Sequence, residues 1–327
     1  MNILMIAVND PAGTASGLAD ALNRLTAHRC RVATLETRYN HGWRKDLHLP
    51  DLDEAGLAEL EAALRGADVF HFHMTADEHL RLGPFLPADF LRGKLVVHHH
   101  HGHPDFRAHP EKYRARYARR GRRNLLVSTP DLLRLLPEAR WQPNAVPEHA
   151  PAYRPPARRP PEPPRVAHAP TRKELKNTAD LLAVVAELRA DGLDLELELI
   201  DDAPHAECLR RKARCHMAFD HMQGYYGMSS LESLAQGVPV VAGLDDWCAG
   251  HMRAFAGRAE LPWIVARDRS ELRAALARLA RDPEAREAAG RAARRFMEEC
   301  WSEARVVALL DNFYAGLRPD HAGAGRA

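Results

Sequence analysis

Short apolar stretches alternate with amphipathic helical stretches along nearly the whole chain, and this alternation limits the possible folds more than any other feature. The run Asn2 to Val8 is continuously apolar, and after a loop it leads into Leu18, Leu22 and Leu25 at helical spacing. A strand without polar alternation is buried on both faces, which is typical of parallel sheets covered by helices. The sequence therefore predicts βαβ units and a doubly wound α/β fold.

The same alternation continues through the first half of the chain and restarts in the second half. We expect strands at 31–35, 68–73, 94–98, 125–127, 165–169, 193–200, 217–219 and 238–242. We expect helices at 54–64, 178–190 and 229–235, and mostly helix from 270 onward with a break at 281–283. In the helix at 178–190, the side chains expected to face inward are Leu181, Leu182, Val185 and Leu188.

A proline-rich segment separates the two halves, with prolines at 151, 155, 156, 160, 161, 163 and 164. Such a segment cannot hold a helix or a central strand, so we interpret residues 151–164 as an interdomain linker. The predicted domains are 1–150 and 165–300, each with a Rossmann-like sheet. A helix follows at 301–317, and a disordered tail is predicted at 318–327 because it is rich in Gly, Ala and Arg.

Composition and charge exclude some classes of protein. The 327 residues carry 46 Lys plus Arg against 44 Asp plus Glu, so the net charge of +2 gives no reason to expect nucleic acid as a partner. The 5 cysteines are scattered and form no CxxC pair, which favours free thiols in a reducing cytoplasm. The N-terminus does not look like a signal peptide, and no apolar run approaches a membrane span of about 20 residues. We expect a cytoplasmic protein whose contact with a membrane, if any, is peripheral at the inner face.

The most informative stretch is a glycine-containing loop, 224–227, that leads into a short helix ending at Gly237. A helix N-terminus offers unpaired N–H groups and a positive dipole end to an anion. Gly227 would let the backbone approach a phosphate closely, and Glu232 lies one turn into the helix, where it could accept hydrogen bonds from sugar hydroxyls. The alternative is a tight helix start without a ligand.

A basic turn follows the first strand of the second half. Thr171, Arg172, Lys173 and Lys176 lie where the carboxyl ends of parallel strands form a crevice. Cations at this position suit a diphosphate leaving group, because they neutralise the charge that develops on it. The alternative is a solvated basic turn.

Histidines are concentrated at the ends of two predicted strands of the first half. His98 to His101 are consecutive and must alternate between the two faces of the sheet, so at most two can converge on one ion. His71 and His73 could join them, but packing at a strand end is the simpler role, and we predict no metal site. The first loop, 9–16, carries Gly13 but no GxGxxG, so the dinucleotide fingerprint is absent. In this loop Asp10 is either a cleft residue or a cap of the loop backbone.

The segment from Gly224 to Val241 resembles the donor-site signature of retaining GT-B glycosyltransferases, especially family 4 (glycosyl transferases group 1). The usual form is Glu-x-Phe-Gly-x-x-x-x-Glu-Ala-x-Ala-x-Gly-x-Pro-Val, and this chain matches it at Gly227, Glu232, Ala235, Gly237 and Pro239. The resemblance implies that Glu232 binds the ribose hydroxyls and that the backbone of 227–229 touches the diphosphate or sugar. The family's first Glu, which contacts the donor hexose, falls on Gly224.

Other segments extend the resemblance over residues 2–317. The basic turn is similar to a His-x-Pro-Thr/Ser segment ending in Lys-Gly-Thr, in which Lys176 and either Arg172 or Lys173 would hold the pyrophosphate. Asn177 replaces the usual Gly, and Asn tolerates the left-handed conformation best among non-Gly residues. His101 with Gly102 resembles a His-Gly pair that faces the cleft, which implies that His101 lies near the transferred sugar.

The resemblance thus implies an α/β GT-B architecture in which the C-terminal helix returns to the first, acceptor-binding domain. The catalytic candidates are His101, Arg172, Lys176 and Glu232. The donor-binding candidates are Gly13, Thr171, Arg172, Lys173, Lys176, Gly224, Tyr226, Gly227, Met228, Ser229 and Glu232. The partners would be a nucleotide sugar and a glycan or lipid-linked acceptor, with no metal or other cofactor. The alternatives are a GT-B sugar-nucleotide epimerase and a non-catalytic nucleotide-sugar or metal-binding protein. The donor sugar, the acceptor and the oligomeric state are not indicated by the sequence.

Overall fold

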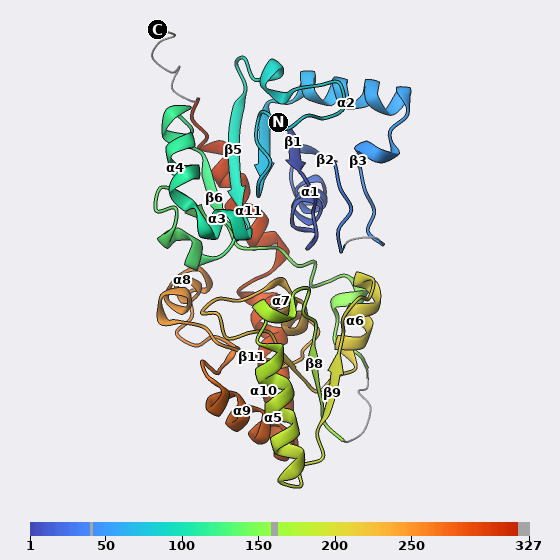
Figure 1. Ribbon diagram of the computed structural model, residues 1–327, viewed down its shortest axis with the longest axis vertical. Coiled ribbons are helices and arrows are strands. Elements are labelled where there is room, and N and C mark those ends of the chain that lie inside the picture. The colour runs from blue at the N-terminus through green and yellow to red at the C-terminus, as the bar shows by residue number, and fades with distance from the viewer. Residues whose placement is uncertain (40–41, 158–162, 320–327) are drawn as a thin grey trace. The chain divides into compact units, whose positions relative to one another are not determined.

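The computed structural model describes residues 1–39, 42–157 and 163–319. The chain divides into two compact units, which we call the first unit (Met1–Ala145 together with the segment from Ala304) and the second unit (Val146–Glu303) (Figure 1). Part of the proposed linker, 158–162, and the end of the proposed tail, 320–327, lie outside the described residues. The division falls just before the proline-rich segment, and Pro151–Tyr153 forms a short 3-10 helix in the second unit.

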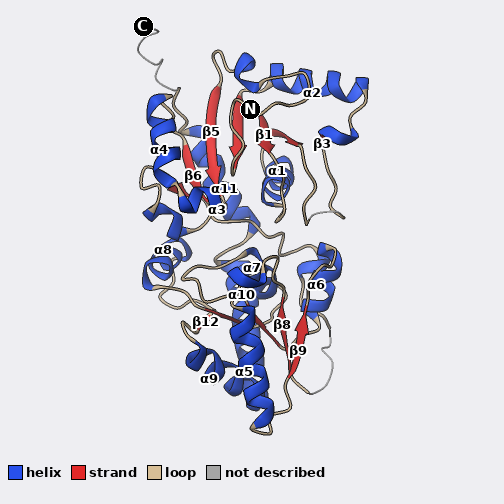
Figure 2. Ribbon diagram, in the orientation of Figure 1, coloured by secondary structure: helices blue, strands red, loops and turns tan. Residues whose placement is uncertain are grey.

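The first unit is built on a parallel seven-stranded sheet with the order β3-β2-β1-β4-β5-β6-β7 (Figure 2). Its strands are β1 (Asn2–Ala7), β2 (Arg29–Thr34), β3 (Leu47–His48), β4 (Val69–His73), β5 (Leu95–His100), β6 (Leu125–Val127) and β7 (Arg140–Trp141). Its helices are α1 (Thr14–Leu25), α2 (Glu54–Gly66), α3 (Pro104–Ala108), α4 (Pro110–Arg119) and α11 (Glu303–Ala315).

Alternate residues of the central strands enter two different cores, as the continuous apolar runs predict. Ile3 and Met5 of β1 pack in one core with residues of α1 and α11, including Leu310. Leu4 and Ile6 pack in the other core with residues of α2. The predicted return of the last helix to the first domain is therefore confirmed, because α11 supplies part of the first core.

The second unit has a parallel five-stranded sheet with the order β12-β11-β10-β8-β9. Its strands are β8 (Arg165–His168), β9 (Glu196–Leu199), β10 (Met217–Phe219), β11 (Val240–Ala242) and β12 (Ile264–Val265). Its helices are α5 (Thr178–Ala190), α6 (His205–Ala213), α7 (Met228–Ala235), α8 (Asp246–Ala256), α9 (Arg269–Arg281) and α10 (Pro283–Glu299). The predicted class, two doubly wound parallel sheets, is confirmed.

Two details of the expected pattern were wrong. Leu182 is 46% exposed, because the buried stripe of α5 runs through Leu181, Val184, Val185 and Leu188 and leaves its neighbour turned outward. Strand β5 extends to His100, so most of the histidine run lies inside the strand rather than after it. No helix of the described residues is both long enough and apolar enough to span a membrane.

Candidate donor site in the second unit

The strand order of the second unit predicts a crevice at the carboxyl ends of β8 and β10. The chain runs from β8 outward to β9 and then crosses to β10 on the other side of β8. The loops that leave β8 and β10 therefore diverge, and such a switch point is where open α/β sheets bind ligands. The loop after β8 carries Lys176 and Asn177, and the loop after β10 begins at Asp220 and ends at Gly227.

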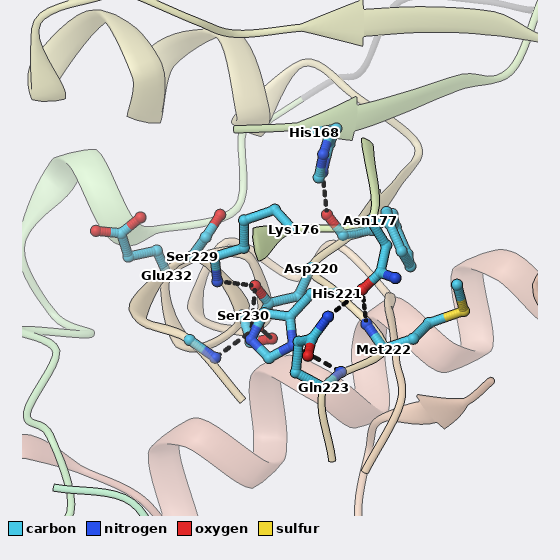
Figure 3. A network of polar contacts seen from close by, with 12 residues as sticks. His168, Lys176, Asn177, Asp220, His221, Met222, Gln223, Ser229, Ser230 and Glu232 are labelled. Carbon is cyan, nitrogen blue, oxygen red and sulfur yellow. Dashed lines mark hydrogen bonds and ion pairs between the residues drawn. The ribbon is translucent and has the colours of Figure 1, made fainter. Parts of the chain in front are cut away.

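Asp220 organises this crevice from a buried position. One of its carboxylate oxygens, Oδ2, accepts hydrogen bonds from the backbone N–H of Gly227 and from Oγ of Ser230, both at 2.6 Å (Figure 3). The other oxygen, Oδ1, lies 3.0 Å from Nζ of Lys176. Asp220 thus ties the basic turn to the start of α7, although the two segments are far apart in the sequence.

Gly227 is required by this close approach. An ideal Cβ at position 227 would lie 2.9 Å from Nζ of Lys176 and 3.0 Å from Oδ1 of Asp220. Gly227 is also the N-cap of α7, and its backbone N–H donates to the same carboxylate that contacts the ammonium of Lys176. Lys176 and the Gly227 loop, predicted separately to contact a diphosphate, thus lie next to each other in this structure.

Asn177 links the two loops by a second route. It has the left-handed backbone conformation, with φ of 53°, as expected of a residue in place of glycine. Its side-chain Oδ1 accepts hydrogen bonds from the backbone N–H of Met222 at 2.9 Å and from Nε2 of Gln223 at 3.1 Å (Figure 3). At the end of β8, Nδ1 of His168 lies 3.0 Å from the carbonyl oxygen of Phe219 in β10. The end of β8 is thereby fastened to the end of β10.

The charges of this crevice are set by burial and by the neighbours of Asp220. Burial alone would raise the pKa of the Asp220 carboxyl, but His221, Lys176 and the hydrogen bonds from Ser230 and Gly227 together hold that pKa well below its usual range. Burial lowers the pKa of His168 to about 4. At neutral pH the crevice therefore contains an anionic Asp220 and a neutral His168.

Glu232 lies on α7 but makes its contacts with a different element. Its Oε1 lies 2.7 Å from Nε2 of His205, and its carboxylate forms an ion pair with the buried Lys212, both on α6. Burial raises the pKa of Glu232, but the charges of Lys212 and His205 outweigh it and bring the pKa to about 2. Figure 3 shows the carboxylate of Glu232 pointing away from Asp220. Glu232 is therefore charged and held beside the crevice rather than in the Lys176 network.

The other cations of the basic turn do not join Lys176. Thr171, Arg172 and Lys173 are exposed. Nε of Arg172 lies 2.8 Å from Oε1 of its neighbour Glu174, and Nζ of Lys173 lies 2.6 Å from Oδ2 of Asp201. Of the predicted cations, only Lys176 meets the Gly227 loop.

The remaining residues of the predicted donor loop have distinct places. Gly224 has a φ of +87° and bridges to Leu244. Tyr226, predicted to bind the donor, is only 1% exposed, because its ring packs on Trp263 and edge-on against Trp301. Met228 opens α7, and the Oγ of Ser229 lies 3.3 Å from Nζ of Lys212. Tyr226 is thus part of an aromatic core in this structure.

Gly13, Asp10 and His101 belong to the first unit. Gly13 has a φ of +64°, and an added Cβ would overlap the ring of Trp43, so packing alone requires this glycine. Asp10 accepts hydrogen bonds from the backbone N–H groups of Ala15 and Ser16, which makes it a cap of α1. His101 shares a hydrogen bond of 2.9 Å between its Nε2 and Nδ1 of His73, and burial lowers its pKa to about 3.

Three partners at the site were missed by the sequence-based reasoning. His205 and Lys212 lie seven residues apart, on one face of α6. That helix has few buried side chains and was not predicted, so no apolar stripe pointed to it. Asp220 stands directly after a predicted strand, and this position at a carboxyl end was the signal that could have identified it.

A scan against protein-family models finds no match, and a search of curated proteins by sequence finds none either. Solved structures do match. Sucrose-phosphate synthase from Thermosynechococcus elongatus matches with a TM-score of 0.63 and 15% identity, over 96% of this chain and 98% of that one. Anabaena HepE in complex with UDP and glucose matches with a TM-score of 0.65 and 12% identity, over 97% and 100%. UDP-GlcNAc 2-epimerase from Neisseria meningitidis bound to UDP-GlcNAc matches with a TM-score of 0.50 and 12% identity, over 96% and 100%.

Topology and site together define a class of protein, an α/β chain of two doubly wound units in which Lys176, Asp220 and Gly227 meet at the switch point of the second sheet. The structural matches extend over both units. The fold of this chain is accordingly the GT-B fold of the glycosyltransferases, as the resemblance of its donor loop implies.

Proposed function

We propose that this protein is a glycosyltransferase that moves a hexose-type sugar from a nucleoside-diphosphate sugar to an acceptor. The observation that carries the proposal is the meeting of Lys176, Gly227 and the N-terminus of α7 at the switch point of the second sheet. An ammonium beside a helix N-terminus suits a diphosphate. The presence of UDP in a structure with the same fold, HepE, supports this choice of ligand.

In the proposed reaction the nucleoside diphosphate leaves the anomeric carbon, and negative charge develops on its terminal phosphate. Lys176 and the N-terminal dipole of α7 would stabilise that charge, which is the role that a metal ion plays in other transferases. We therefore propose that transfer at this site needs no metal. A retaining outcome is proposed from the resemblance of the donor loop alone.

Asp220 would act as the organiser of the site rather than as a reactant. Its carboxylate holds the N–H of Gly227 and the hydroxyl of Ser230, and it neutralises Lys176 while the phosphate is absent. A bound diphosphate would take over part of the interaction with Lys176. Glu232 would accept hydrogen bonds from the ribose hydroxyls at the side of α7 where His205 and Lys212 now hold it.

The test begins with thermal stabilisation by a panel of nucleotide sugars, followed by nucleotide release with the best donor. Replacing Lys176 by Ala should reduce kcat/KM by about 100-fold or more, because one preorganised charge at the leaving group is lost. Lys94→Ala removes an ammonium from a half-buried position of the first unit, where it contacts only the carbonyl of Arg65 among the described hydrogen bonds, and should change neither readout. Full activity of Lys176→Ala would contradict the proposal.

A sugar-nucleotide epimerase is the second candidate, favoured by the match to the UDP-GlcNAc 2-epimerase. The two functions differ in whether the reaction requires an acceptor. An epimerase converts the donor sugar without any acceptor, whereas a transferase releases the nucleotide. Analysis of the sugar products in the absence of acceptor therefore separates them.

The acceptor is proposed to be a glycan or a lipid-linked sugar, and the location cytoplasmic, in keeping with five free cysteines. Residues 104–123 are rich in Arg and Lys, but their contacts give little support for an anionic partner. Arg114 pairs with Glu138, and Arg116 lies 2.7 Å from Asp77, so these charges are used within the first unit. We accordingly propose no nucleic-acid partner.

A further inference from the structure

Four histidines of the first unit lie on one face of its sheet. Strands β4 and β5 are parallel neighbours, and His73 is directly opposite His99 in their register. Because side chains alternate between faces along a strand, His71 shares the face of His73, and His101 follows on the face of His99. All four imidazoles therefore gather at the carboxyl ends of two adjacent strands, the end of a parallel sheet that usually carries ligands.

Three of these side chains have the spacing of a metal site. His71, His73 and His99 are buried, and one ring nitrogen from each lies within 4.8 Å of the other two. Nε2 of His71 and Nδ1 of His99 are 3.3 Å apart. Two nitrogens bound to a tetrahedral zinc ion at about 2.0–2.1 Å are separated by roughly 3.3–3.4 Å. Nε2 of His71 and Nδ1 of His99 are therefore as far apart as two nitrogens bound to one zinc ion.

The cluster also contains a nitrogen atom of a proposed ligand that the protein does not satisfy. Within the part of the chain that the structure describes, Nε2 of His73 is buried without a hydrogen-bond partner, while Nδ1 of the same ring contacts His101. A buried polar atom without a partner costs free energy, and an ion bound at Nε2 would supply the missing partner.

A neighbouring helix supplies the support that a metal-binding histidine usually has. The hydroxyl of Tyr314, on α11, lies 2.7 Å from Nδ1 of His71. A proton on Nδ1, donated to this oxygen, leaves the lone pair of Nε2 directed toward His99. Such outer hydrogen bonds fix the ring orientation and the tautomer of a ligating histidine.

We propose that His71, His73 and His99 form a binding site for a zinc-class divalent ion in the first unit. Imidazole suits zinc among the divalent metals, and three nitrogen ligands leave a fourth position for water or for a shift of His101. The ion would join β4 to β5 at the point where Tyr314 of α11 packs against them. The zinc site is inferred from contacts within the first unit and does not rest on the proposed sugar transfer.

The test uses the full chain without an affinity tag, freed of metal by a chelator and then titrated with Zn²⁺ in a calorimeter. One tight equivalent and a rise in the melting temperature of the first unit are expected. With Co²⁺ as the probe, the intense visible absorption of a tetrahedral complex should appear. His99→Asn should abolish both, while His100→Asn is the matched control, because His100 is the next residue of β5, faces the other side and contacts Tyr117 instead.

A second variant and a spectroscopic measurement test the zinc site even if His99→Asn does not fold. Tyr314→Phe retains the ring of a core residue but loses the hydrogen bond to His71, and it should weaken zinc binding by about 10–100-fold. X-ray absorption of the unmutated zinc form should show three imidazoles. Fewer than three, or weak binding that His99→Asn and Tyr314→Phe leave unchanged, would mean an adventitious ion only and would overturn the proposal.

Discussion

Gly227 stands where an ammonium, a carboxylate and a helix start leave room for no side chain. The two groups that a methyl group would meet are the ends of Lys176 and Asp220, and such ends can move. The strain of an added methyl would therefore appear mainly as a displaced ammonium rather than as an unfolded protein.

We expect Gly227→Ala to raise the KM for the donor by about 10-fold, since Lys176 would no longer reach the phosphate position. Stability should change by less than about 1 kcal/mol. The measurements are donor titration and denaturant unfolding. Gly250→Ala is the control, because an added Cβ in that helical position meets nothing within 4 Å. An unchanged KM in Gly227→Ala would contradict the role of Lys176.

Glu232 gives a prediction about acid stability. Its pKa is about 2 in the folded chain, below the ordinary 4.5 of a glutamate, mainly because Lys212 and His205 offset its burial. A lowered folded-state pKa stabilises the protein above the ordinary pKa, and this stabilisation is lost as the pH falls through the folded value. Between about pH 5 and pH 2, the free energy of unfolding should therefore fall less steeply in Glu232→Gln than in the parent chain.

Urea unfolding across this pH range measures the difference. Glu54→Gln, at an exposed position of α2, controls for the loss of a carboxylate elsewhere in the chain. Parallel pH dependences of Glu232→Gln and the parent would mean that the contacts with Lys212 and His205 do not stabilise the fold.

At the scale of elements, α5 contains two neighbouring leucines, both predicted from the sequence to face inward, that differ in burial. Leu181 is fully buried in the core of the second unit, whereas Leu182 is exposed. A step of one residue turns a helix by about 100 degrees, so only one of two adjacent apolar residues can occupy the centre of the buried stripe.

We therefore expect Leu181→Ala to reduce the free energy of unfolding by about 2–5 kcal/mol, through lost burial and a cavity. Leu182→Ala should cost less than about 1 kcal/mol, because a surface change away from special features does little. Chemical denaturation of both variants is a direct comparison. Equal losses would place Leu182 in the core and contradict the described face of α5.

Elements with an apolar period could be predicted from the sequence, and α5 and β10 have the predicted bounds. Helix α6 could not, because its buried residues are only Leu209 and Lys212 and its other faces are polar. Because α6 was not predicted, its residues His205 and Lys212 could not be predicted as the partners of Glu232. The pairing of His73 with His99 was also beyond the sequence, because it depends on strand register rather than on a local pattern.

At the scale of the whole molecule, the alternation of strands and helices and the proline-rich break were enough to predict two similar domains. Neither these patterns nor the resemblance could predict which side chains meet at each site. Lys176 and Asp220 are 44 residues apart, and only the strand order of the second sheet brings them together. The choice of Lys176 over Arg172 and Lys173 likewise depends on where the turn after β8 points.

Binding of the proposed nucleotide ligand should protect two loops of the second unit from hydrogen exchange. With UDP bound, hydrogen exchange of the backbone should slow in 168–177 and 220–232 of the second unit, because the loops at its switch point would open less often. Mass spectrometry of peptides from both units measures this effect. Inosine without phosphate serves as the control ligand, and protection confined to the first unit would contradict the assignment of the donor site.

The first unit is made from both ends of the chain, and this has a consequence during translation. The ribosome delivers residues 1–145 early, but the helix that closes one face of their sheet, α11, begins only at Glu303. Until then the nascent chain carries an uncovered apolar surface around Val69 and Val97, which Val307 and Leu310 later cover. The second unit, contiguous in sequence, can finish folding first. We therefore expect the N-terminal half to remain incompletely folded until α11 has been synthesised.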